Sequence, residues 1–591
     1  MLELLRRFMA KYKAKTAIAV LTKVVEVGFE VLTPLVVARM IDAGVQTGNT
    51  DEVVRMGATL LVFALVSYSF TLVCQRLAAQ VSQGVGTDVR DALYAHINRL
   101  SPSDLDSLTI PSLITRVTND VNQMQLAVAL LVRMGPRWPL LALGSMVAAI
   151  AIDMRLGIVF LVCMPLIGAV FALVMRASIP FFGRMQQKLD RVSRVTRESL
   201  SGMRVIRAFR QQDAQTQRSH EAIDEQTRIA VAIGRLSAIL NPATFAIMNI
   251  GVAAILWAGG HRVNVGDLTT GQVMAFVSYM TQALVAVTVM TNIVVVVMRG
   301  HASSLRILEV LEREPSMTDA GNAMVELTDA TTGIALELRD VSFAYEGAAV
   351  PALAGIGLKL PAGATLGVIG GTGSGKTTLS KLLPRLYDAS SGSVSVFGTD
   401  VRSYPFAQLR SLVSVVPQNV SLVSGTVRSN LVWRNPNATD QELWEALGTA
   451  QADDFVRSLQ KGLDSPVEAG GVNFSGGQRQ RLTIARALVG APRIVVLDDA
   501  ASALDYATDA RLRAALRKNR DRLTSVIVSQ RVAAVMGADK ILVLDHGSPA
   551  GLGTHEDLLR TCGLYREIYE SQMHGDGRGL DDGSVRSGEG V

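Results

Sequence analysis

Long uninterrupted hydrophobic stretches dominate the first half of the chain, and polar residues there are mostly confined to the segments between them. A helix needs about 20 apolar residues to cross the hydrocarbon core of a membrane, and six stretches approach or exceed that length. They are Thr16–Ile41, Gly57–Ala79, Leu126–Ile152, Leu156–Met175, Ala238–Gly259 and Gly271–Met298. A spanning segment must satisfy its own backbone hydrogen bonds, so each of the six is predicted to be a transmembrane helix.

The connections between these stretches alternate between short and long. Three of them, Gly44–Glu52, Asp153–Arg155 and Gly260–Asp267, are short and poor in Lys and Arg. The other two, Ser82–Met124 and Arg176–Arg235, are long, polar and patterned as helices. Basic residues mark the cytoplasmic side of a membrane protein, and the chain also begins with a basic stretch. We therefore expect both termini and both long excursions to lie in the cytoplasm.

The pattern of the chain changes after Leu311. Residues 312–333 are polar and are broken by Pro315 and Gly321, which predicts a linker. Residues 334–573 show short strands and turns and then alternating strands and helices, a pattern typical of an α/β domain. Residues 574–591 are rich in Gly, Asp and Ser and are predicted to be disordered. The predicted fold is a membrane α-helical bundle with long cytoplasmic extensions, residues 1–311, fused to an α/β domain.

Composition supports a large membrane portion and argues against nucleic acid as a partner. Of the 591 residues 49% are hydrophobic and 19% are charged, whereas soluble proteins average about 25% charged residues. The net charge is +6, but basic residues gather just before the first span, as membrane topology requires. The cysteines, Cys74, Cys163 and Cys562, are scattered and form neither a metal-binding spacing nor a disulfide framework.

The clearest chemical motif is the loop Gly370-Gly371-Thr372-Gly373-Ser374-Gly375-Lys376-Thr377-Thr378. It follows an apolar strand and leads into a helical pattern, which is the context of a phosphate-binding loop. Glycines let successive backbone N–H groups point at one anion, and the helix N-terminus adds partial positive charge. Lys376 is expected to reach the β- and γ-phosphates, and the Thr377 hydroxyl is expected to bind Mg²⁺. The chain therefore binds a nucleoside triphosphate.

Four further features of this half belong with that loop. Tyr345 ends a strand before it and offers an aromatic face for a base. Gln418 follows a buried-looking strand, where its oxygen could reach Mg²⁺ or a water. Asp498 ends the apolar strand Ile494–Leu497, the position of the metal-binding acid in phosphate-loop enzymes. A second Gly-rich turn at a helix N-terminus, containing Ser475-Gly476-Gly477-Gln478, predicts a second anion site.

Two anion-binding helix starts in one small domain suggest that two domains share each nucleotide. The simplest arrangement is a head-to-tail pair, in which the phosphate loop of one domain faces the Ser475 turn of the other. Two nucleotides are then sandwiched between the domains and hold them together.

In chain order, Tyr345, the phosphate loop, Gln418, the Ser475 turn, Asp498 and Ser502-Ala503-Leu504-Asp505 resemble the A-loop, Walker A, Q-loop, signature, Walker B and D-loop of ABC transporters. With six spans ahead of the P-loop ATP-binding cassette, the chain resembles an exporter-type half-transporter over nearly its whole length. The resemblance implies ATP-driven transport, with ATP and Mg²⁺ as cofactors and Thr377, Gln418 and Asp498 around the metal. It also implies a multi-pass protein of a bacterial plasma membrane, and coupling helices in the excursions that dock on cassettes near Gln418, one of them on the partner's cassette.

Two catalytic positions depart from the family pattern. The glutamate that follows the Walker B aspartate is replaced by Asp499, whose carboxylate is roughly 1–1.5 Å short of the usual position, and a misplacement of about 1 Å can cost on the order of 10²-fold in rate. The switch histidine is replaced by Gln530, which can donate a hydrogen bond but cannot carry a proton. The signature is intact. We therefore expect a heterodimer, in which this chain contributes a weakly hydrolysing site and completes a strong site of its partner, which carries the glutamate and the histidine.

Several alternatives remain open from the sequence. Lys23, Glu26 and Glu30 share one face of the first span, and they either contact a ligand or form a self-satisfied ion pair. The transported compound is expected to be lipophilic or amphipathic, in contact with membrane lipid. A homodimer with two slow sites, an importer of siderophores with the exporter fold, and a regulatory membrane subunit that transports nothing are the other functions considered.

Overall fold

The structure is a computed structural model that describes residues 1–319, 321, 324–326, 333–500 and 503–573. The chain divides into two compact units: Met1–Asn98 with Pro111–Arg313, and Arg99–Ile110 with Glu314–Val591. The second unit therefore contains a short part of the first predicted excursion together with the α/β domain. The predicted disordered tail, residues 574–591, and much of the predicted linker lie outside the described residues.

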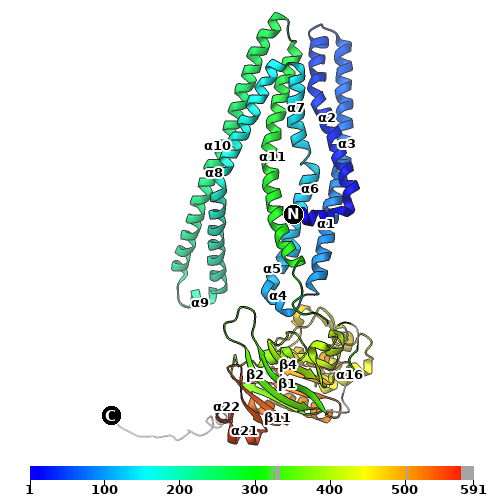
Figure 1. The fold of residues 1–591 in the computed structure, drawn as a ribbon, viewed down its shortest axis with the longest axis vertical. Coiled ribbons are helices and arrows are strands. Elements are labelled where there is room, and N and C mark those ends of the chain that lie inside the picture. The colour runs from blue at the N-terminus through cyan, green and yellow to red at the C-terminus, as the bar shows by residue number, and fades with distance from the viewer. Residues whose placement is uncertain (320, 322–323, 327–332, 501–502, 574–591) are drawn as a thin grey trace, which may run out of the picture. The chain divides into compact units, whose positions relative to one another are not determined.

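The first unit consists of helices, several of them very long (Figure 1). Its helices are α1 (Leu2–Phe8), α2 (Lys13–Arg39), α3 (Thr50–Ile97), α5 (Ile110–Thr115), α6 (Val121–Arg133), α7 (Arg137–Ile152), α8 (Met154–Ser201), α9 (Met203–Ala208), α10 (Gln212–Val265) and α11 (Thr270–Leu311). Helix α2 packs along α3, and α8 packs along α10. Phe160, Ile255 and Phe276, from α8, α10 and α11, are fully buried in an apolar cluster of this unit.

Five stretches of the described chain are long and apolar enough to cross a membrane: Thr50–Ile97, Ile110–Ile152, Met154–Ser201, Gln212–Val265 and Thr270–Leu311. They confirm five of the six predicted spans. Helix α2 has 27 residues and covers the first predicted span. Its charged residues make it less apolar than the other five stretches, so this span stays a prediction. Helices α3, α8 and α10 are each longer than the predicted span that they contain. They therefore continue from the spans into the long excursions.

The third predicted span, Leu126–Ile152, is not a single continuous helix. Helix α6 ends at Arg133 and α7 begins at Arg137, with a turn between them at Met134–Pro136. Proline lacks an N–H group and clashes with the preceding turn, so it starts a helix more readily than it continues one. The Gly135-Pro136 pair was the sequence signal for this interruption.

The second unit contains both strands and short helices (Figure 1), and its described residues form three sheets. Its strands are β1 (Ile334–Phe343), β2 (Leu353–Pro361), β3 (Thr365–Gly370), β4 (Ser391–Val396), β5 (Thr399–Asp400), β6 (Val413–Val416), β7 (Gly425–Thr426), β8 (Pro466–Val467), β9 (Ile494–Asp498), β10 (Thr524–Val528), β11 (Lys540–Asp545) and β12 (Ser548–Gly553). Its helices are α4 (Pro102–Leu108), α13 (Lys376–Leu382), α14 (Phe406–Leu412), α15 (Val427–Leu431), α16 (Asp440–Thr449), α17 (Asp453–Ser458), α18 (Gly476–Leu488), α19 (Tyr506–Lys518), α20 (Val532–Val535), α21 (His555–Thr561) and α22 (Gly563–Met573).

The six-stranded sheet, ordered β12-β11-β3-β10-β9-β6, positions the nucleotide-binding residues. Strands β11, β3, β10, β9 and β6 are parallel, and their near-continuous apolar sequences are buried, as expected for strands covered on both faces. In the register, Val528 of β10 lies between Asp498 of β9 and Val368 of β3. The carboxyl ends of β3, β9 and β10 therefore meet at one edge, where ligands bind in sheets of this type.

Candidate functional site

Most of the sequence-predicted nucleotide residues surround a single cavity of about 310 Å³ at the edge of the six-stranded sheet. Its lining comes from the phosphate loop and from the ends of four strands. The lining residues are Tyr345, Ala352, Thr372, Gly373, Ser374, Gly375, Lys376, Thr377, Thr378, Gln418, Asp498, Asp499, Val528 and Gln530. The structure thus brings together segments that are far apart in the sequence, and it places them where a nucleotide would lie.

Two glycines of the phosphate loop are required by its close packing. A Cβ atom at Gly370 would come within 2.2 Å of the Leu544 carbonyl oxygen. Gly375 has a φ of +93°, and a Cβ there would lie 2.5 Å from the Ala352 carbonyl oxygen. Since α13 begins directly after Gly375, these glycines allow the backbone to curl tightly before the helix N-terminus, the geometry that binds phosphate.

The Lys376 ammonium group lies inside the phosphate loop, against its backbone carbonyl groups. Its Nζ donates hydrogen bonds to the carbonyl oxygens of Gly370 at 2.9 Å and Gly371 at 2.5 Å. Burial lowers the pKa of Lys376, and the negative charges of Asp499 and Asp498 oppose that shift. A buried ammonium group held by carbonyl oxygens is available to meet phosphate oxygens that carry full negative charge.

The Asp498 carboxylate is held by two hydroxyl groups of α13. Thr377 Oγ1 donates to Asp498 Oδ1 at 3.2 Å, and Ser380 Oγ donates to Asp498 Oδ2 at 2.8 Å. Ser380 was not predicted from the sequence, although it lies one helical turn after Lys376. Magnesium prefers oxygen ligands and is usually held by one or two carboxylates together with substrate phosphates. Thr377 and Asp498 fit that requirement, and among the described residues no group of three or more His, Cys, Asp or Glu forms a separate metal site.

Asp499 occupies the catalytic position in a left-handed backbone conformation, with a φ of +50°. Burial raises the pKa of its carboxyl group, and the neighbouring Asp498 raises it further. Arg531, Lys376 and a hydrogen bond with the Gln418 side chain act in the opposite direction. Gln418, predicted to approach Mg²⁺, lines the same cavity as Asp499.

Gln530 lines the same cavity at the end of β10. Its backbone carbonyl accepts a hydrogen bond from Gln572 Nε2 at 2.8 Å, which ties this turn to α22. The residue itself is exposed, so its side-chain amide is accessible to a ligand in the cavity. The Gln530 amide retains hydrogen-bonding capacity, but unlike a histidine it cannot carry a proton.

Tyr345 lines the same cavity and follows the end of β1. Its ring packs edge-on against Phe343, with the ring centroids 4.9 Å apart. Its hydroxyl group shares a hydrogen bond of 3.2 Å with Thr378 Oγ1. The ring is held in place next to the first turn of α13, where a base can stack on it.

The predicted signature forms the N-terminus of α18. Ser475 is the N-cap: its hydroxyl accepts from the Gln478 N–H, and Gln478 Oε1 accepts from the Ser475 N–H at 2.9 Å. Ser475 and Gly476 are exposed, and none of the signature residues lines the cavity around Lys376. Of the predicted D-loop, Ser502 lies outside the described residues, whereas Ala503 and Leu504 precede Asp505, which caps α19.

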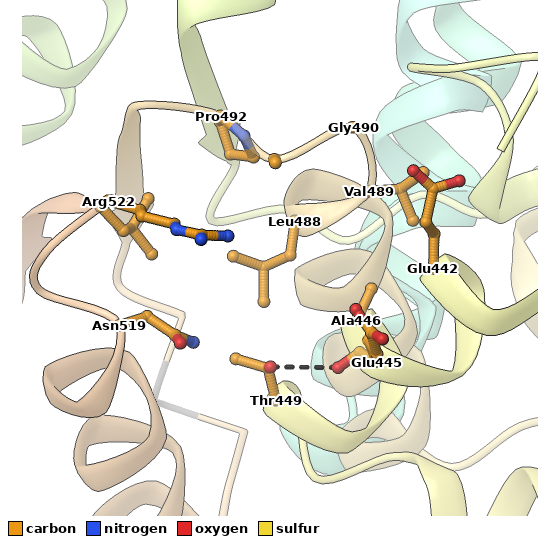
Figure 2. Close-up of a pocket in the computed structure, with 12 residues that line it drawn as sticks. Glu442, Glu445, Ala446, Thr449, Leu488, Val489, Gly490, Pro492, Asn519 and Arg522 are labelled. Atoms are coloured by element: carbon orange, nitrogen blue, oxygen red, sulfur yellow. Dashed lines mark hydrogen bonds between the residues drawn. The ribbon is translucent and has the colours of Figure 1, made fainter. Parts of the chain in front are cut away.

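A second cavity, of about 270 Å³, lies on the α/β unit among α16, the end of α18 and the turn after α19 (Figure 2). Its polar side chains are Glu442, Glu445, Thr449, Asn519 and Arg522, and the Arg522 guanidinium points into it. No sequence-predicted site residue lines this cavity. It is therefore distinct from the nucleotide site.

The charged face of the first predicted span takes part in an ion network. Lys23 Nζ lies 2.5 Å from Glu26 Oε2, and the Arg137 guanidinium lies 2.6 Å from Glu26 Oε1 and 3.1 Å from Glu30 Oε1. The side chains of Lys23 and Glu26 are only 3% and 4% exposed. This geometry agrees with the self-satisfied pair and adds Arg137, which joins α2 to α7 and was not predicted.

Replacing Arg137 by methionine is expected to lower the stability of the helical unit. Removing one member of a buried ion network leaves a charge without a partner, which costs about 3–5 kcal/mol. Thermal unfolding of the protein in lipid nanodiscs measures the effect as a lower transition temperature. Arg39→Ala is the matched control, because Arg39 pairs with Glu52 at 3.4 Å while 66% exposed, and exposed pairs contribute about 0–1 kcal/mol. Equal transition temperatures for the two variants would contradict a structural role for Arg137.

The fold and the site define a class: a membrane helical unit joined to an ATP-binding domain of the phosphate-loop type. Residues 16–287 match the family described as ABC transporter transmembrane region, and residues 353–502 match the ABC transporter family. The chain is 37% identical to an uncharacterized ABC transporter ATP-binding protein of Mycobacterium tuberculosis, over 97% of this chain and 98% of that protein.

One further relative supports the same family, and one solved structure shows the same fold. The ATP-dependent lipid A-core flippase of Desulfotalea psychrophila is 31% identical, over 85% of this chain and 87% of its own length. The structure of a bacterial Atm1-family ABC exporter with ATP bound has the same fold, with a TM-score of 0.76, 21% identity, and coverage of 98% of this chain and 99% of that one. The chain belongs to the ABC transporter family and is an ATP-driven membrane transporter with the exporter-type fold.

Proposed function

We propose that this chain is one subunit of a heterodimeric exporter that moves lipophilic or amphipathic compounds across a bacterial plasma membrane. It binds ATP and Mg²⁺ in a site that hydrolyses slowly, and its signature completes the hydrolysing site of a second half-transporter. The observation that carries the proposal is the combination of Asp499 and Gln530 with an intact signature. Both substitutions occur in the cavity around Lys376, and the signature lies outside it.

The chemistry of the two substituted positions supports slow hydrolysis at this site. Asp499 is one methylene shorter than glutamate, and it lines the cavity around Lys376. Gln530 donates hydrogen bonds but cannot act as an acid or base. General acid–base catalysis contributes typically 10²–10⁴-fold in rate, so weakening it leaves ATP binding intact while slowing its cleavage.

The exposed Ser475 turn supports a site shared between two chains. It is the N-cap of a 13-residue helix, with backbone N–H groups available to an anion. Its own chain does not place it at the phosphate loop, so its ligand would come from a second cassette. The amphipathic substrate class is supported by relatives named lipid A-core flippases.

Turnover of the chain purified alone tests the heterodimer. We expect its ATPase rate in nanodiscs to be about 10²-fold below that of the chain co-assembled with a second half-transporter that carries glutamate and histidine at these positions. Lys376→Ala provides the background rate. An ATPase rate for the chain alone that equals the rate of the assembled pair would overturn the proposal and favour a homodimer.

Transport itself is tested in vesicles. Vesicles containing the assembled pair are expected to move a lipophilic dye or a labelled phospholipid only when ATP and Mg²⁺ are supplied on the cassette side. A pair that hydrolyses ATP and moves none of a panel of such compounds would favour a regulatory membrane subunit.

A further inference from the structure

The cavity shown in Figure 2 has charges of opposite sign on facing sides, and the two signs do not pair with each other. Glu442 and Glu445 come from α16, whereas Arg522 follows the end of α19. The Arg522 guanidinium points into the cavity from the side opposite α16 (Figure 2). In the described part of the chain, no ion pair or hydrogen bond joins the Arg522 side chain to another residue. Its charge is therefore available to a ligand.

Each of the two glutamates uses one carboxylate oxygen within its own helix region. Glu442 Oε2 accepts hydrogen bonds from the Thr439 N–H at 2.7 Å and from the Thr439 hydroxyl at 3.0 Å, which caps α16. Glu445 Oε1 accepts a hydrogen bond from Gln441 Nε2 at 2.9 Å. These bonds hold both carboxylates in place. The second oxygen of each carboxylate is left to accept a hydrogen bond from a ligand.

The base of the cavity between these charges is apolar. Ala446 and Leu523 are buried members of an apolar cluster, and Leu488 packs against the same cluster. Close-packed residues hold their shape, so the cavity exists before a ligand arrives. Ligand sites typically combine such an apolar lining with a few polar groups that fix orientation. At about 270 Å³ the cavity lies just below the roughly 300–1,000 Å³ of sites for drug-sized molecules, so its ligand is small.

We propose that this cavity is a binding site for a basic amino acid. Its two carboxylates and one guanidinium give the walls a net charge of −1, which a molecule with two cationic groups and one carboxylate complements. The carboxylate of the ligand pairs with Arg522, whose planar fork suits bidentate binding. The two cationic groups of the ligand face Glu442 and Glu445, and its methylene chain lies on Leu488.

Other small ligands match these walls less well. A nucleotide or inorganic phosphate brings several negative charges toward two carboxylates, and a single guanidinium is left to offset the repulsion. A divalent cation suits the carboxylates but meets the like charge of Arg522. The site therefore differs from the nucleotide site in its chemistry as well as its lining. The inference depends neither on a heterodimer nor on the identity of the transported compound.

Titration calorimetry with L-lysine on the full-length protein in nanodiscs tests this site. We expect saturable binding, and Arg522→Gln should weaken it about tenfold or more, because a hydrogen bond between charged groups is lost. Arg522 is exposed, so this variant should fold normally. Lys518→Gln is the matched control, because Lys518 is an exposed cation in the last turn of α19 that does not line the cavity. It should bind L-lysine with unchanged affinity.

Two analogues of lysine assign the contacts. 1,5-Diaminopentane lacks the carboxylate and L-norleucine lacks the side-chain ammonium group, so each should bind about tenfold or more weakly than L-lysine. In Arg522→Gln the preference for L-lysine over 1,5-diaminopentane should disappear. In Glu445→Gln the preference for L-lysine over L-norleucine should fall, while its preference over 1,5-diaminopentane stays. Hydrogen exchange of residues 440–449 should slow when L-lysine binds, because the ligand ties α16 to the turn after α19.

The proposal is overturned if L-lysine does not bind saturably. It is also overturned if Arg522→Gln binds L-lysine as tightly as the original protein, which would place the ligand elsewhere, such as among the membrane helices. Equal weakening in Lys518→Gln would contradict it as well, because the effect would then follow from net charge alone. Binding of ATP to each variant, measured in parallel, shows separately that the cassette is folded.

Discussion

Asp499→Asn in the assembled transporter is expected to leave at least about half of the ATP turnover, whereas glutamine in place of the partner's catalytic glutamate should remove about 99% or more. The reason is that the two sites of the proposed heterodimer differ in their chemistry. In this chain the carboxylate is one methylene short of glutamate and half-buried. A group that contributes little to the rate can be neutralised with little loss. Steady-state ATPase rates in nanodiscs at saturating ATP measure both variants.

Lys376→Ala is the control that separates binding from hydrolysis at the same site. It removes the ammonium group that is expected to hold the phosphates, so occupancy of this chain's site should fall and the cassettes should close less often. We expect it to lower turnover well below that of Asp499→Asn. A tenfold or greater loss in Asp499→Asn, with ATP binding unchanged, would show that this chain hydrolyses ATP efficiently and would exclude the proposed asymmetry.

The nucleotide site was predictable because its chemistry is concentrated in short segments. The phosphate loop and the Ser475 turn each hold their glycines and polar groups within a few residues. The structure places the phosphate loop between strand β3 and helix α13, as expected. The meeting of β3, β9 and β10 at one edge follows from their parallel order. The sequence could not predict the hydrogen-bond partners of each side chain, such as the bond from Ser380 to Asp498.

In the membrane half, the sequence predicted where the long apolar helices lie, but it did not predict most of the contacts between them. Arg137 pairs with Glu26 and Glu30, more than one hundred positions away, and no periodicity in either segment connects them. The attachment of α4 to the cassette depends on Tyr387 and Ser316, which are still farther along the chain. Such contacts are properties of the packed fold, whereas hydrophobic length is a property of each segment alone.

The second large effect is expected from the signature: Gly476→Asp should lower turnover of the assembled transporter about 10²-fold or more. In the proposed heterodimer, a carboxylate there would face the γ-phosphate held by the partner, and like charges in a closed site of low dielectric constant repel strongly. The loss of a single preorganised contact to developing charge costs about 10²–10³-fold in other enzymes. ATPase measurements on the pair, with this chain alone altered, provide the value.

Folding of this chain should tolerate the same substitution. A Cβ atom at Gly476 meets nothing within 4 Å, and an acidic residue in the first turn of a helix is favourable. Gly563→Asp is the matched control, since Gly563 also begins a cassette helix and also has open space at its Cβ. We expect Gly563→Asp to keep full turnover, and both variants to bind ATP at the phosphate loop of this chain with unchanged affinity. Weaker binding at that loop in Gly476→Asp would show that the signature acts within its own chain, contrary to the head-to-tail arrangement.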